Sequence, residues 1–179
     1  MPEDNIKILS DRLVYAGKLF DLHVDEIELP GGIKATREYI THPGAVCMVP
    51  VDPDGRLLLV RQYRHAAGES LLELPAGTRE PGEEPEETAR RELAEEVGRA
   101  PAVVEPLGEF YVAPGYVSEY IHLYLCTGLT EAEEDGDEDE DIEVVAMTGE
   151  EALAAIESGD IRDAKSIIGI LRWARRGAG

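Results

Sequence analysis

The chain has 179 residues and a mass of 19.6 kDa, enough for one ordinary domain with a small additional lobe. Hydrophobic residues make up 43% and charged residues 31% of it, which permits a packed core and argues against wholesale disorder. The formal net charge of −21 disfavours binding to nucleic acid and to anionic membranes. Because no apolar run of about 20 residues and no signal peptide is visible, we expect a cytoplasmic protein.

The two cysteines agree with that expectation. Cys47 and Cys126 lie inside apolar runs and form no CxxC pattern. Reduced, cytoplasmic thiols are the simplest interpretation.

The first 42 residues are predicted to form short strands. Residues 12–16, 19–29 and 34–41 are rich in β-formers, and Pro30-Gly31-Gly32 marks a turn between the last two stretches. We therefore expect a small antiparallel β lobe at residues 1–42, followed by a larger domain at residues 43–179.

Strands and helices alternate irregularly after residue 42. Residues 45–50 and 56–63 are predicted to pair as a hairpin, and the other predicted strands are 71–74, 103–112, 119–126 and 142–147. The predicted helices are 86–97, which has Pro85 at its start and Gly98 at its end, 149–158, and 164–175. This pattern predicts an α/β (α+β) fold in which helices cover a mixed sheet.

Acidic residues concentrate at residues 83–96 and 131–143. Such runs are usually solvated surfaces, but Glu92, Glu95 and Glu96 have the spacing i, i+3, i+4, which places them on one side of a helix. Carboxylate oxygens are the ligands that hard divalent cations prefer. Arg91, four residues before Glu95, could orient that carboxylate or could form an ordinary helical ion pair.

The loop before this helix offers a further oxygen. Gly77 permits a backbone turn that could aim the Ala76 carbonyl at the same cation. The sequence therefore predicts a metal site made of helix glutamates and one backbone carbonyl.

The whole stretch follows one spacing: Gly77, five residues, Glu83, seven residues, then Arg91-Glu92-Leu93-Ala94-Glu95-Glu96-Val97-Gly98. It resembles the signature box of the Nudix hydrolases and departs from it only at Arg99, where the family has an aliphatic residue. With this composition the seven fixed positions match by chance in roughly 5 of 100,000 chains.

The resemblance implies an α/β/α sandwich that holds Mg²⁺, or Mn²⁺ as a substitute, against a diphosphate linkage. By position, Glu92, Glu96 and the Ala76 carbonyl would be metal ligands, and Glu95 would be a ligand or the partner of a metal-bound water. Glu83 and Arg91 would shape the loop.

Other segments resemble the ADP-ribose pyrophosphatase subgroup. Pro114 lies sixteen residues after Gly98 and precedes Ser118-Glu119, as in that subgroup, although Pro114-Gly115 could equally be a simple turn. The resemblance implies that the substrate contacts Ala113, Pro114, Gly115 and Glu119.

The second acidic run resembles the subgroup's catalytic loop. By position Glu138 would be the general base and Glu140 a metal ligand, although the many acids there leave open which of the two takes the proton.

The basic residues and the lobe complete the resemblance. Arg37 and Arg64 match stretches that reach the substrate and would contact its diphosphate or ribose; the alternative is that both are surface arginines. The lobe resembles one that pairs with a second copy into a homodimer. Tyr15, Phe20 and Tyr116 all remain candidates for stacking on the adenine.

The function implied is Mg²⁺-dependent cleavage of ADP-ribose to AMP and ribose 5-phosphate. One alternative is another Nudix specificity, for a different nucleoside diphosphate sugar or a damaged nucleotide. The other is a non-catalytic nucleotide-sensing module, which usually lacks box carboxylates, whereas all of them are present here.

Overall fold

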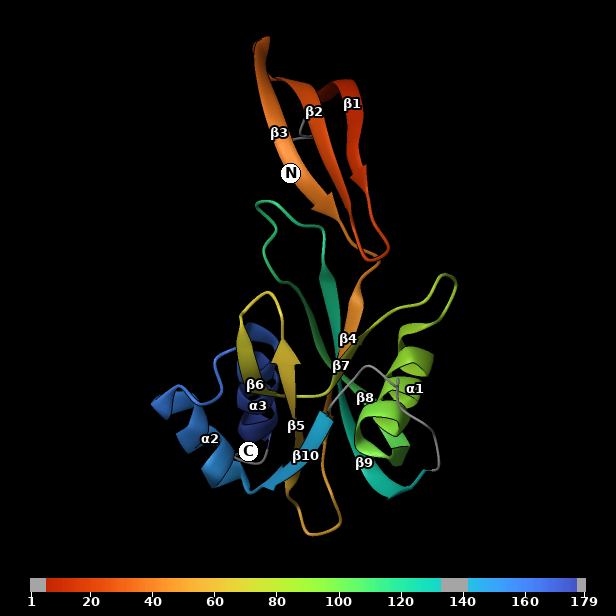
Figure 1. The fold of residues 1–179 in the computed structure, drawn as a ribbon, viewed down its shortest axis with the longest axis vertical. Coiled ribbons are helices and arrows are strands. Elements are labelled where there is room, and N and C mark those ends of the chain that lie inside the picture. The colour runs from red at the N-terminus through yellow and green to blue at the C-terminus, as the bar shows by residue number, and fades with distance from the viewer. Residues whose placement is uncertain (1–5, 133–141, 177–179) are drawn as a thin grey trace. The chain divides into compact units, whose positions relative to one another are not determined.

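The computed structural model describes residues 6–132 and 142–176 (Figure 1). The chain divides into two compact units. One combines Met1–Gly44 with Tyr111–Tyr120, and the other combines Ala45–Phe110 with Ile121–Gly179. Among the residues that the structure describes, no helix is both long and apolar enough to span a membrane.

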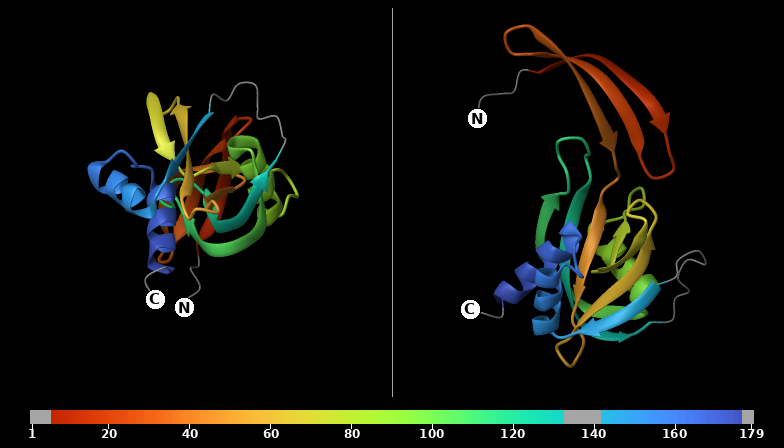
Figure 2. Two further views of the ribbon diagram at one scale, coloured as in Figure 1. Left: turned by 90° about the horizontal axis from the view of Figure 1, so that it is seen from below. Right: turned by 60° about the vertical axis from the view of Figure 1, so that its left-hand side comes forward.

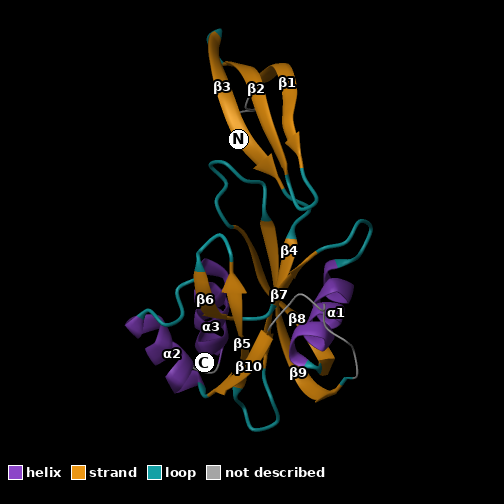
Figure 3. Ribbon diagram, viewed as in Figure 1, coloured by secondary structure: helices purple, strands orange, loops and turns teal. Residues whose placement is uncertain are grey.

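The first unit is built on a three-stranded antiparallel sheet in the order β1-β2-β3 (Figure 3). Its strands are β1 (Lys7–Ala16), β2 (Asp21–Leu29) and β3 (Ile33–Thr41). The turn between β2 and β3 places Gly31 and Gly32 at φ values of 89° and 79°, a region that glycine enters without strain. β1 begins five residues earlier than predicted because it pairs with β2 along its whole length.

The segment 111–120 belongs to this unit through its backbone. The N–H groups of Tyr116 and Val117 donate to the Ala113 carbonyl at 3.1 and 3.0 Å, which closes a tight turn. Ile40, near the end of β3, donates its N–H to the Tyr116 carbonyl at 2.8 Å. Nothing in the composition of residues 111–120 indicated that they pair with β3.

The second unit contains two sheets. A four-stranded mixed sheet has the order β7-β4-β9-β8, with β4 and β9 parallel, and a three-stranded antiparallel sheet has the order β10-β5-β6. The bounds are β4 (Ala45–Pro50), β5 (Leu57–Arg64), β6 (Glu69–Glu73), β7 (Ala76–Thr78), β8 (Arg99–Tyr111), β9 (Tyr120–Glu131), β10 (Ile142–Met147), α1 (Pro85–Val97), α2 (Gly149–Ser158) and α3 (Ala164–Arg176).

Burial along β4 defines three layers. Every residue of β4 is buried; Cys47 and Val49 pack in a hydrophobic cluster with α2 and α3, whereas Val46 and Met48 pack with α1. β5 alternates in the same way. Helix α1 therefore covers one face of the strands and α2 with α3 the other (Figure 2), which confirms the predicted α/β/α sandwich.

One prediction about strand pairing was wrong, and one strand was not predicted. The 45–50 and 56–63 segments do not form a hairpin, because β4 and β5 lie in different sheets and an isolated bridge between Val51 and Leu57 takes the place of a paired ladder. The strand that was not predicted is β7, which has three residues and pairs with β4. A continuous apolar run indicates that a strand is buried but does not identify the strand beside it.

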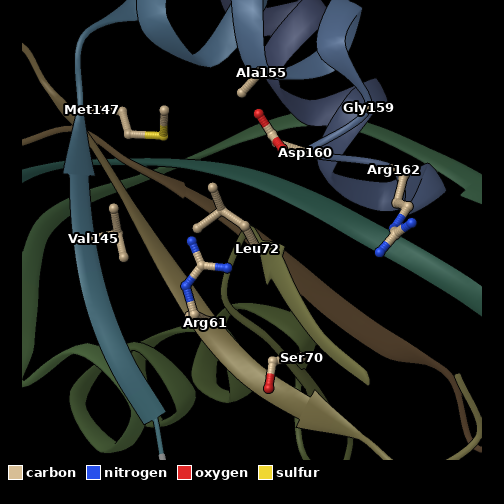
Figure 4. A pocket seen from close by; sticks show the side chains of 9 residues that line it. All are labelled: Arg61, Ser70, Leu72, Val145, Met147, Ala155, Gly159, Asp160 and Arg162. Atoms are coloured by element: carbon tan, nitrogen blue, oxygen red, sulfur yellow. The ribbon is translucent and has the colours of Figure 1, made fainter. Parts of the chain in front are cut away.

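A pocket of about 420 Å³ lies between α2 and the sheet β10-β5-β6 (Figure 4). Leu72 and Val145 form part of its lining, together with Arg61 from β5 and Arg162 from the connection between α2 and α3. It is on the face of this sheet opposite α1 and contains none of the predicted site residues.

Candidate active site

Helix α1 and the loop before it hold the predicted glutamates. Pro85 stands at the first turn, and Gly98 ends the helix with φ 66° and ψ 35° while its N–H donates to the Ala94 carbonyl. Ala89, Leu93 and Val97 are buried against the sheet. The helix bounds therefore match those predicted to within one residue.

Arg91 is the centre of the site. Its guanidinium donates twice to Glu83, with Nε–Oε1 and Nη2–Oε2 distances of 3.0 Å each. Its Nη1 is 2.9 Å from both Glu92 Oε1 and Glu95 Oε2. The predicted contact to Glu95 is therefore present, but it is one of three carboxylates that a single arginine organises.

Glu83 is held in its ionised form. The hydrogen bonds from Arg91 lower the pKa of Glu83 to about 2, against the opposing effect of burial, and the Thr88 hydroxyl and the Glu80 N–H contribute in the same direction. The Glu83 hydrogen bonds raise the pKa of Arg91 in turn. The loop is thereby fixed to the helix by a permanent ion pair.

Gly77 is needed for a reason other than the predicted turn. It lies in β7, and its φ is outside the left-handed region. A Cβ added here would lie 1.8 Å from Glu92 Cδ and 2.1 Å from Glu92 Oε1. Only glycine therefore leaves the space that the Glu92 carboxylate occupies beside the loop.

Glu96 ties the loop to the helix from the other side. Its side chain is buried, and Oε2 accepts the Ala76 N–H at 3.0 Å. Ala76 in turn pairs with Cys47 of β4. The structure thus brings together Ala76, Glu92, Glu95 and Glu96 around one loop–helix junction.

The donor set at this junction fits a hard divalent cation. It consists of carboxylate oxygens, and the missing Cβ of Gly77 provides the cradle for one of them. Within the described residues, however, no group of three or more His, Cys, Asp or Glu side chains is arranged so that it could hold a metal ion. Instead, Arg91 contacts Glu92 and Glu95, and the Ala76 N–H contacts Glu96.

Arg64, another predicted site residue, lies in the same unit at the end of β5. Its Nε donates to Glu73 Oε2 at 2.7 Å, and its side chain is 36% exposed. Glu73, which is almost fully buried, was not identified from the sequence because it is a lone acid at the end of an apolar stretch.

The remaining predicted substrate contacts belong to the first unit. Arg37 is exposed on β3, and Ala113, Pro114, Gly115 and Glu119 lie in the 111–120 segment. In that unit Pro114 and Gly115 line a pocket of about 370 Å³ together with the tyrosines Tyr39, Tyr111 and Tyr116. Glu138 and Glu140, the predicted base and metal ligand of the acidic loop, lie outside the described residues.

The chain is similar in sequence to a known domain family and to characterised proteins. Residues 41–168 match the model of the NUDIX domain. The chain is 40% identical over 166 residues to an ADP-ribose pyrophosphatase of Bacillus subtilis (strain 168), covering 92% of this chain and 90% of that protein. It is 38% identical over the same length and with the same coverage to a methanol dehydrogenase activator of Bacillus methanolicus.

A solved structure described as an ADP compounds hydrolase has the same fold. It superposes with a TM-score of 0.87 at 27% identity, covering 97% of this chain and 96% of that one.

Proposed function

The chain belongs to the NUDIX family of hydrolases, and we propose that it hydrolyses the diphosphate linkage of ADP-ribose to give AMP and ribose 5-phosphate. The observation that carries this proposal is the Gly77–Glu92 packing within a complete box of Glu83, Arg91, Glu95 and Glu96. The substrate is supported by the similarity to an ADP-ribose pyrophosphatase over 92% of the chain.

In this proposal Glu92, Glu96 and the Ala76 carbonyl hold Mg²⁺, for which Mn²⁺ could substitute, and Glu95 is a further ligand or contacts a metal-bound water. Bound there, the cation would neutralise the diphosphate and polarise its phosphorus. Arg91 keeps Glu92 and Glu95 in place, and its ion pair with Glu83 fixes the loop that follows Ala76 and Gly77. The chain's own contribution is thus a preorganised set of oxygens.

The proposed chemical step is attack of water on one phosphorus of the diphosphate. Glu138 or Glu140 accepts the water proton, the phosphoanhydride P–O bond breaks, and the phosphate of the departing half leaves with the bond electrons. Arg37 and Arg64 hold phosphate or ribose oxygens through their amino groups. The pocket beside Pro114 offers tyrosine rings, among them Tyr116, on which the adenine can stack.

We further propose that the enzyme is a cytoplasmic homodimer. The support for a dimer is the sheet of the first unit, in which every residue of β1 is exposed, including Ile8 at 66% and Leu13 at 52%. A three-stranded sheet that leaves such side chains in water lacks a cover, which a second copy would supply. Free, buried Cys47 and Cys126 support a reducing compartment.

The test is turnover of a panel of nucleoside diphosphate sugars and oxidised nucleotides by the purified protein, with and without a chelator. We expect ADP-ribose to be the best substrate and the chelator to abolish turnover. Glu96→Gln should lower kcat by at least about 100-fold with an unchanged melting temperature. Glu86→Gln, on the same helix but paired with Arg90, is the matched control and should keep full activity.

If the protein prefers another nucleoside diphosphate sugar, that compound is the substrate in place of ADP-ribose, and the proposed hydrolase activity stands. Binding of nucleotides without any turnover would instead support the sensing module.

A further inference from the structure

A buried ionic network joins the start of α3 to the strand that leads into the candidate active site. Glu73, with only 4% of its side chain exposed, places Oε2 2.7 Å from Arg64 Nε and Oε1 3.0 Å from Lys165 Nζ. Lys165 Nζ is also 3.0 Å from Asp163 Oδ2. Two cations and two anions alternate, so neither carboxylate is buried without a partner of opposite charge.

The network is tied to the backbone on both sides. Asp163 Oδ2 accepts the Ser166 N–H at 3.1 Å in the first turn of α3, and Ser166 Oγ accepts the Leu74 N–H at 2.6 Å. Burial lowers the pKa of Lys165, but the charges of Asp163 and Glu73 outweigh burial and raise it overall. Lys165 is therefore a lasting cation between two carboxylates.

The same network borders the candidate active site. Glu73 is three residues before Ala76, whose N–H donates to Glu96. Burial raises the pKa of the Cys47 thiol, and the charges that act on this thiol include those of Lys165 and Glu96. Cys47 pairs with Ala76, so the network and the Glu96 carboxylate lie close to the same buried residue.

Arg64 is the outer end of the network. Glu73 holds its guanidinium by Nε alone, and in residues 6–132 and 142–176 neither of its Nη amino groups makes a hydrogen bond. A guanidinium gripped in this way keeps the pair of amino groups that suits a phosphate.

Lys165 explains why Glu73 contacts Arg64 through one oxygen. Its Nζ lies 3.0 Å from Glu73 Oε1 and competes with Arg64 for that oxygen. Without the lysine, Glu73 could bind Arg64 through both oxygens, as arginine–carboxylate pairs commonly do. One Arg64 amino group would then bind Glu73 and could no longer bind the substrate.

We propose that Lys165 is a positioning residue for substrate binding, which acts through Glu73 to hold Arg64 with both amino groups directed to a phosphate of the bound nucleotide. The inference rests on the proposed function, since it needs Arg64 to contact the substrate. It predicts that Lys165 affects KM and that its effect passes through Arg64.

The experiment is a double-mutant cycle on the full-length enzyme, with KM and kcat measured for ADP-ribose. Arg64→Ala and Lys165→Met should each raise KM by roughly tenfold, the effect of losing one charge-assisted hydrogen bond, with kcat changed less than KM. In the Arg64→Ala background Lys165→Met should raise KM by no more than about twofold. Lys165→Arg should restore most of the wild-type KM.

Arg162→Met is the matched control. It removes an ion pair to Glu69 between the same two segments of the chain without touching Arg64, so its KM should stay at the wild-type value. If Lys165→Met does not fold, as judged by its melting curve, Glu73→Gln takes its place in the cycle against Arg64→Ala.

Two failures are distinguishable. If the wild type prefers another nucleoside diphosphate sugar, the proposed substrate is wrong, and the same cycle run on that compound still tests Lys165. If the two changes multiply in their effect on KM, or if Lys165→Met lowers only the melting temperature, Lys165 does not act through Arg64 and the inference is overturned.

Discussion

Replacing Gly77 with alanine tests the loop–helix junction directly. The added Cβ would lie 1.8 Å from Glu92 Cδ, whereas non-bonded carbon atoms approach to about 3.5–4.0 Å. The carboxylate must therefore move by about 2 Å. A misplacement of about 1 Å in an active site can cost 100-fold in rate, so we expect kcat/KM to fall at least about 100-fold, or about 2.7 kcal/mol of transition-state stabilisation.

The fold should tolerate the same change. Glu92 is partly exposed and can turn toward solvent, and the loss of its pair with Arg91 leaves that guanidinium in contact with Glu83 and Glu95. The assay is kcat/KM for ADP-ribose across a Mg²⁺ titration, beside the melting temperature. We expect low turnover, a higher Mg²⁺ requirement and a nearly unchanged melting temperature.

A second variant isolates the cause. In a Glu92→Ala background there is no carboxylate to displace, so Gly77→Ala should lower neither kcat/KM nor stability any further. Wild-type activity in the single Gly77→Ala variant, or a further large loss in the double variant, would refute the packing argument.

Three other outcomes follow from described contacts. Ionised Glu83 contributes stability that is fully present above its ordinary pKa of 4.5 and is lost as the pH falls toward about 2. In Arg91→Met the free energy of unfolding, measured by urea titration, should therefore fall less between pH 4.5 and 2 than in the wild type. An equal fall in both proteins would contradict this. Burial raises the pKa of Cys126 to about 12, so its thiol should react with a disulfide reagent at pH 8 only after denaturant is added, and fast reaction of the native protein would argue against the buried position. Replacing Ile8 and Leu13 with serine should convert a dimer to monomers in light scattering; a monomeric wild type would remove the proposed dimer.

Helix α1 was predictable because its signals are local. Pro85, the glutamate spacing and Gly98 all act within one segment, so the bounds and the Arg91–Glu95 contact follow from helical geometry. The roles of the loop residues were less accessible. Gly77 was expected to make a turn, but it is required because a side chain from α1 packs against it.

Features that depend on distant pairing escaped the sequence analysis. β7 exists only beside β4, and the contact of Glu73 with Lys165 joins residues 92 positions apart. The segment 111–120 joins the first unit through hydrogen bonds to β3. None of these pairings has a local periodicity, and Glu138 and Glu140 stay predictions because they lie outside the described residues.

The complete burial of β4 has a consequence for how the second unit unfolds. Its side chains belong alternately to the two hydrophobic clusters, so displacing β4 exposes both clusters to solvent at once. The unit should therefore denature in a single cooperative transition. In hydrogen–deuterium exchange, the amides of Cys47 and Met48 should be among the slowest, exchanging only when the whole unit opens.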